Sequence, residues 1–244
     1  METRLAELVS RLKEAAGKNL ESVVLYGSAA SGTYRPGSSD LNVLCTLVNM
    51  NVCELQLIAP VVHWWTHEEK EPPPLFFLTE ELRRSTDVFA IESLDLKRAH
   101  RVLFGKDPVA DLHIPMNLHR VQIERDLRLL LLRLRQHALL AGKNELEYLV
   151  TLKKTISSAI TLLRHTLLAF GEEPPADPAS LFARIGALTG ADAETFQIVY
   201  EHHEGRDLGK DSFTAYDQYI HALERVITAL DRMVPKKEWQ RVAK

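Results

Sequence analysis

Cysteine is scarce in this chain, whose 244 residues include only Cys45 and Cys53. So few thiols exclude the disulfide-stapled class of small secreted proteins, and both cysteines are expected to be buried and reduced. The chain also has little excess charge of either sign, because 33 acidic residues accompany 30 basic ones for a formal net charge of −3. A bulk nucleic-acid binder would usually carry a basic excess, so we expect no bulk nucleic-acid binding.

Long apolar runs are missing as well. The most apolar segment, residues 129–132, is followed by Arg133 and Arg135 and is far too short to span a membrane. Residues 1–8 have the pattern of a charged amphipathic helix and not that of a signal peptide. These absences predict a cytoplasmic protein without a membrane partner. With 45% hydrophobic residues, the chain can still bury the core of one large or two ordinary domains.

The secondary-structure signals divide the chain into two parts. Up to residue 108, helix and strand patterns alternate, with strands predicted over 22–26, 40–47, 75–78, 88–91 and 102–104. From residue 118 onward only helical patterns occur, with apolar residues every three or four positions. We therefore predict an α+β fold. It comprises a small mixed sheet with helices on one side (1–108), a linker (109–117), an antiparallel helical bundle (118–235) and a basic tail (236–244).

The most informative stretch joins the first two predicted strands. It contains Tyr26-Gly27-Ser28, eleven intervening residues and then Asp40-Leu41-Asn42-Val43. Gly27 allows a phosphate to approach the backbone, and Ser28 offers a hydroxyl and an N–H. Asp40 and Asn42 lie two apart on a strand and so share a face. Because a carboxylate beside bound phosphates can hold a divalent ion, this stretch predicts a phosphate-and-metal site.

The same residues resemble the signature of the nucleotidyltransferase superfamily, which includes DNA polymerase beta, kanamycin nucleotidyltransferase and the minimal nucleotidyltransferases. The resemblance implies transfer of a nucleoside monophosphate from a nucleoside triphosphate to a hydroxyl acceptor, with Mg²⁺ or Mn²⁺ as cofactor. It assigns Gly27, Ser28 and Arg35 to the nucleotide. The metal ligands would be Asp40, Asn42 and Glu92, of which Asp40 and Glu92 would be catalytic. Asp87 and Asp95 are alternatives to Glu92 as the third carboxylate.

Asn42 departs from the signature, because the family has a second aspartate at this position. An amide oxygen can ligate Mg²⁺ but carries no charge and does not bridge two ions as a carboxylate does. Two divalent ions about 4 Å apart repel by on the order of 16 kcal/mol at an effective dielectric constant near 20. A catalytically inactive nucleotide-binding or partner-binding protein is therefore an alternative, and a toxin–antitoxin component is a third. The sequence identifies neither the hydroxyl acceptor nor a protein partner, and it is compatible with a homodimer.

Overall fold

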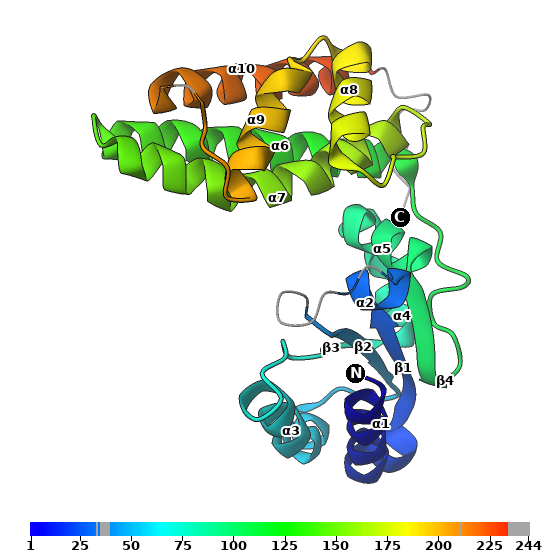
Figure 1. Cartoon of the computed structure of the whole chain (residues 1–244). Coiled ribbons are helices and arrows are strands. Elements are labelled where there is room, and N and C mark those ends of the chain that lie inside the picture. The colour runs from blue at the N-terminus through cyan, green and yellow to red at the C-terminus, as the bar shows by residue number, and fades with distance from the viewer. Residues whose placement is uncertain (33, 35–39, 210, 234–244) are drawn as a thin grey trace. The chain divides into compact units, whose positions relative to one another are not determined.

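The computed structural model describes residues 1–32, 34, 40–209 and 211–233. Its contacts divide the chain into two compact units, Met1–Pro115 and Met116–Lys244, and each is described here by itself (Figure 1). The first unit is a sheet with helices and the second is helical, which confirms the predicted α+β class. Among the described residues, no helix is long and apolar enough to cross a membrane.

A four-stranded mixed sheet organises the first unit. The strands lie in the order β3-β2-β1-β4, with β1 antiparallel to both β2 and β4 and with β2 parallel to β3. Gly17–Asn19 and Ser85–Asp87 form single 3₁₀ turns. The elements along the chain are α1 (Glu2–Ala16), β1 (Leu20–Tyr26), α2 (Ser28–Ser31), β2 (Asn42–Leu47), α3 (Val52–His67), β3 (Leu75–Leu78), α4 (Thr79–Arg84), α5 (Ala90–Arg98) and β4 (His100–Gly105).

Helices cover both faces of this sheet, so the prediction of helices on one side is wrong. Val23 and Leu25 of β1 pack with the apolar residues of α1 and α3. Val24, between them, points to the other face and packs with Leu82 of α4 and Leu96 of α5. Adjacent residues of a strand point to opposite faces of the sheet. A strand whose successive residues are all apolar is therefore expected to be buried on both faces.

The strand predicted over residues 88–91 is also wrong. Val88 and Phe89 are exposed, and α5 begins directly after them at Ala90. The short apolar run matches both a strand and the start of a helix. Ala90, Ser93 and Leu96, spaced three residues apart, are buried along one side of α5, which favours the helix. The fourth strand follows α5 instead, over His100–Gly105.

The two cysteines differ from each other. Cys45 lies on β2 and is buried, as predicted, and burial raises the pKa of its thiol far above the ordinary value. Cys53 lies in the first turn of α3 and is exposed, so the prediction that it is buried is wrong. Position in an amphipathic helix decides which side faces water, and Cys53 is on the outer side.

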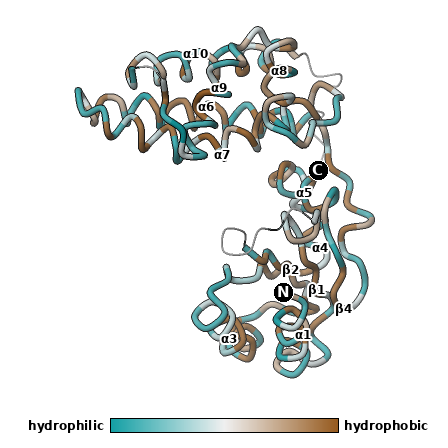
Figure 2. Tube along the Cα trace, in the orientation of Figure 1, coloured by the Kyte–Doolittle hydropathy of each residue, from teal (hydrophilic) through white to brown (hydrophobic). Residues whose placement is uncertain are grey.

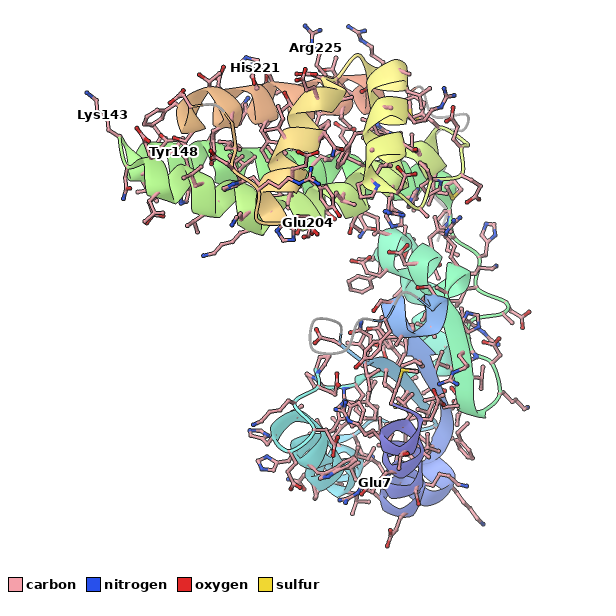
Figure 3. The ribbon with its side chains drawn as sticks, viewed as in Figure 1. Glu7, Lys143, Tyr148, Glu204, His221 and Arg225 are labelled. Atoms are coloured by element: carbon pink, nitrogen blue, oxygen red, sulfur yellow. The ribbon has the colours of Figure 1, made fainter. Side chains whose placement is uncertain are left out.

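The second unit consists of amphipathic helices in its described part: α6 (Met116–Ala141), α7 (Glu145–Ala169), α8 (Pro178–Thr189), α9 (Ala193–His203) and α10 (Ser212–Asp231). Hydrophobic and hydrophilic residues alternate along α6 and α7 in Figure 2. Tyr148, labelled in Figure 3, makes edge contacts with the rings of Phe213 and Tyr216 and joins α7 to α10. The predicted tail over 236–244 lies outside the described residues.

Candidate functional site

The predicted motif lies at one end of the strands, where β1 ends and both of its antiparallel neighbours begin. Tyr26, the last residue of β1, is paired with Asn42 on β2 and with His100 on β4. The N–H of Gly27 donates to the carbonyl of Ala99 at 3.3 Å. The Gly27-Ser28 turn therefore follows a central strand and is anchored between β2 and β4.

Gly27 has a backbone conformation that side chains rarely allow. Its φ is 75°, and a Cβ placed on it would lie 3.2 Å from Nδ2 of Asn42. Its carbonyl accepts the N–H groups of Ala30 and Ser31 at 3.0 Å each, which closes the turn that starts α2. The amide of Asn42 and the backbone of Gly27 thus stand face to face, and a side chain on the glycine would require the Asn42 amide to shift.

Asp40 and Asn42 flank Leu41, which is fully buried in the core between the sheet and α1 and α3. Asp40 is exposed, whereas Asn42 is half-buried as the first residue of β2. The N–H of Leu41 donates to Oε2 of Glu71 at 2.7 Å. Asp40 thus sits just outside the last β1–β2 pair, beside the Gly27 turn.

Glu71 is a residue of this site that sequence reasoning missed. Its side chain is only 7% exposed, and Oε1 accepts from Nη2 of Arg4 at 2.8 Å. Glu71 lies between charged residues and three prolines, so it belongs to no helical or strand periodicity. Its partners, Arg4 and Leu41, lie far away in the sequence, so no local pattern indicates that it is buried.

Glu92 is placed in a helix and not at the end of a strand. It lies in the first turn of α5 and is exposed, so the basis on which it was chosen as the third carboxylate is wrong. The two alternatives to Glu92 also lie outside the strands. Asp87 ends the 3₁₀ turn before α5, and Asp95 lies within α5. Arg35 lies outside the described residues.

The strand beside β2 supplies no carboxylate either. β3 begins at Leu75, opposite Leu44, and residues 72–74 before it are all proline. The sequence of β3 itself is Leu-Phe-Phe-Leu. In this register Pro73 lies at the level of Asn42, so residues 72–78 place no carboxylate beside Asn42. Glu71, just before these prolines, accepts the N–H of Leu41.

A histidine and a carboxylate lie on the other side of the Gly27 turn. Nε2 of His100 is 3.1 Å from Oδ2 of Asp107, and the other carboxylate oxygen accepts the N–H groups of Val109 and Ala110. Burial raises the pKa of Asp107, but the hydrogen bonds from His100 and Val109 outweigh it and hold the pKa below its ordinary value. Burial raises the pKa of Tyr26, which therefore stays a neutral phenol.

No family model and no curated protein sequence matches this chain. It is similar in structure to the spectinomycin adenyltransferase AAD(9) from Enterococcus faecialis, solved with ATP and spectinomycin. The two share 14% sequence identity with a TM-score of 0.55, over 94% of this chain and 99% of that one. The fold of this chain is therefore similar to that of a nucleotidyltransferase. At the level of the fold, the resemblance stated from the Gly27-Ser28 motif is confirmed.

The side chains near the Gly27 turn suit one divalent ion better than two. Asp40 offers a carboxylate, and Asn42 offers a neutral amide oxygen. Within the described residues, no group of three or more His, Cys, Asp or Glu side chains could hold a metal ion by itself. Phosphate oxygens of a nucleotide at the Gly27 turn would have to complete the coordination sphere. One ion that arrives with a nucleotide fits these residues, and a two-ion clamp made by the protein alone does not.

Proposed function

We propose that this protein binds a nucleoside triphosphate with Mg²⁺ or Mn²⁺ at the Gly27-Ser28 turn and transfers its nucleoside monophosphate to a hydroxyl acceptor. The observation that carries the proposal is the 3.2 Å approach between a Cβ position on Gly27 and the amide of Asn42, with Asp40 two residues before it. ATP is the nucleotide to test first, because the adenyltransferase of similar fold was solved with ATP.

Each residue of the site has a role in this proposal. The backbone of Gly27 and the hydroxyl and N–H of Ser28 bind the triphosphate, with Arg35 as a further phosphate ligand. Asp40 holds the metal ion and Asn42 adds a neutral oxygen. Glu92, now offered by the first turn of α5, stays the candidate for a third carboxylate, with Asp87 and Asp95 as its alternatives.

The reaction is an in-line displacement at phosphorus. The acceptor oxygen bonds to the α-phosphorus, the bond from this phosphorus to the bridging oxygen breaks, and pyrophosphate leaves while the hydroxyl proton passes to solvent. The divalent ion, when bound, neutralises charge on the phosphate oxygens. The protein's own part is to bind the triphosphate against Gly27 and to hold Asp40 and Asn42 on the same side of it.

Nucleotide binding without transfer is the second candidate function, and Asn42 favours it. The site has one carboxylate at the start of β2, a neutral amide where the family has an acid, and prolines before β3. With one carboxylate fewer than in the family, the site offsets the charge of a second divalent ion less well. A single ion bound together with its nucleotide still fits the site. This candidate requires nucleotide affinity with no nucleotidylated product.

Calorimetric titration of the full chain with ATP, in the presence and absence of excess Mg²⁺, tests the proposed site. We expect metal-dependent binding that Asp40→Asn weakens at least about tenfold, because this change removes the one carboxylate at the start of β2. Asp111→Asn, at an exposed position of the same unit, is the matched control and should bind like the wild type. Unchanged binding by the Asp40 variant would refute the site assignment.

A further inference from the structure

We propose that Glu71, paired with Arg4, is a positioning residue that holds the backbone of Leu41 and thereby sets Asp40 and Asn42 against the Gly27 turn. The functional meaning of this arrangement rests on the proposed function, since it concerns the residues assigned to metal and nucleotide. Glu71 itself points into the protein and touches neither ligand in this proposal.

The two oxygens of the Glu71 carboxylate have separate partners. Oε2 accepts the N–H of Leu41 at 2.7 Å, and Oε1 pairs with Nη2 of Arg4 at 2.8 Å. The Leu41 side chain is fully buried, and Glu71 as a residue is 8% exposed. A carboxylate in such surroundings keeps its charge only when it is paired and hydrogen-bonded, and both requirements are met here.

Arg4 and the segment before β3 form a frame around this carboxylate. Nη2 of Arg4 also donates to the Glu69 carbonyl at 2.6 Å, and Nε donates to the Glu69 carboxylate. The guanidinium lies 5.7 Å from the centre of the Trp65 ring, whose Nε1 donates to the carbonyl of Pro72 at 3.0 Å. The frame therefore joins α1, the end of α3 and the start of β2.

Leu41 needs such a partner because it lies just beyond the sheet ladder. The last pair between β1 and β2 is Tyr26 with Asn42, so residues 40 and 41 come before the ladder begins. On the other side of β2, the first pair with β3 is Leu44 with Leu75, so this ladder also begins beyond Leu41. Glu71 gives the backbone at Leu41 the acceptor that a neighbouring strand would otherwise provide.

Stability alone explains this arrangement poorly. A buried ion pair costs desolvation energy and is often no better than apolar side chains of the same volume. What the pair adds here is a fixed direction for one backbone N–H, located between the two residues assigned to the metal. A one-residue slip of β2 would move Asp40 and Asn42 to the opposite face.

Amide exchange at Leu41, followed by NMR on the full chain without ligand, tests the positioning directly. We compare Glu71→Gln, which keeps an acceptor oxygen, with Glu71→Leu, which has similar size but no acceptor. Glu71→Leu should speed exchange at Leu41 by at least about tenfold and Glu71→Gln by less, because a hydrogen bond to a charged group contributes more than one to a neutral group. The amide of Leu44, inside the ladder, should change little in either variant.

Glu7→Gln is the matched control for this comparison. Glu7 also pairs with an arginine of α1, Arg11, but both side chains are exposed, and Glu7 is labelled on α1 in Figure 3. Its loss should leave exchange at Leu41 unchanged. If Glu71→Leu does not fold, Arg4→Met removes the partner of the carboxylate and should also speed exchange at Leu41. Wild-type protection of Leu41 in the folded Glu71→Leu or Arg4→Met variant would overturn the proposal.

The affinity for ATP with Mg²⁺ separates positioning from simple packing. Glu71→Leu should raise the dissociation constant at least about tenfold at a temperature where the variant is folded, whereas a core variant with the same loss of Tm should not. Equal affinity of Glu71→Leu and wild type, despite fast exchange at Leu41, would overturn the functional part. If the wild type itself does not bind ATP, the proposed function fails, and the exchange measurement still decides whether Glu71 holds Leu41.

Discussion

Gly27 is the residue where backbone conformation and site chemistry meet. Its positive φ places the Gly27-Ser28 turn over the start of β2, and the absence of a side chain lets Asn42 approach the backbone. Together with Asp40, these residues form the polar end of a sheet whose interior is apolar. Any substitution at Gly27 therefore affects the conformation and the contact at once.

Replacing Gly27 by alanine should weaken ATP binding strongly and destabilise the protein by about 1–3 kcal/mol, the usual cost of an L-residue in this conformation. Gly17→Ala is the matched control. Gly17 has φ 52° and ψ −125°, near the 75° and −148° of Gly27, but a Cβ there meets nothing within 4 Å. Denaturant unfolding and calorimetric titration of both variants separate the backbone cost from the contact with Asn42. Equal ATP affinities in the two variants would contradict the role given to that contact.

Asn42 decides how much negative charge the site contains. Asn42→Asp should raise the rate of pyrophosphate release from ATP by at least about tenfold, or about 1.4 kcal/mol in the barrier, because it adds a carboxylate beside Asp40. Spectinomycin, the acceptor named for the adenyltransferase of similar fold, serves as the first hydroxyl probe. A detectable nucleotidylated product from the wild type would exclude the binding-only candidate. No gain in the Asn42 variant would show that charge at this position does not limit turnover.

Capping aspartates define where the helices of the second unit begin. Oδ1 of Asp177 accepts the N–H of Ser180 at the start of α8, and Oδ2 of Asp211 accepts the N–H and hydroxyl of Thr214 at the start of α10. The Thr214 hydroxyl and N–H hold the pKa of Asp211 below its ordinary value. These local bonds fix the residues at which both helices begin.

Asp211→Ala should lower the Tm at neutral pH, and this difference should shrink as the pH falls. The sign follows from the depressed pKa in the folded state. The ionised carboxylate stabilises the fold above the unfolded pKa of about 3.9, and this contribution is lost as the pH falls through the lower folded pKa. Thermal unfolding between pH 7 and pH 2.5 measures the effect. Asp207→Ala, at an exposed position before α10, is the control, and a difference that stays constant with pH would contradict the capping role.

Each of the two units has a hydrophobic core of its own. In the first, Leu12 of α1 is fully buried against the sheet, and in the second, Leu223 of α10 is fully buried among helices. Contacts within each unit are dense enough to define it without the other. Such units usually unfold locally as cooperative blocks.

Leu12→Ala should therefore destabilise the first unit by about 2–5 kcal/mol, through lost burial and the cavity left behind. Hydrogen exchange followed by peptide mass spectrometry should detect faster exchange within residues 1–115, and Leu223→Ala should give the reciprocal pattern within 116–233. Faster exchange across both units from either single variant would mean that the chain unfolds as one block.

The sequence alone predicted the features that depend on residues close together in the chain, such as turns, strands and helix starts. Gly27-Ser28 followed by Asp40 and Asn42 predicted the turn and the strand after it, because chain conformation and strand alternation are local properties. The strand begins at Asn42, two residues later than predicted. The pattern Asp177-Pro178 likewise indicates the start of α8, because an N-cap residue followed by proline is a local signal. The α+β class followed from the order of such local signals, and the nucleotidyltransferase fold was implied by the resemblance of the Gly27-Ser28 motif to that superfamily.

Tertiary structure decided what depends on contacts between distant residues. Residues 88–91 match strand and helix equally well by pattern. Leu96 packs with Val24 of the sheet as part of α5, which begins at Ala90, so Glu92 lies in a helix. Cys53 is exposed because of the side that α3 turns to the core. Glu71 reaches Leu41 across 30 positions of the chain, a contact that no local pattern specifies. A hydrogen bond of this kind depends on where the chain returns in space, and only the folded protein determines that.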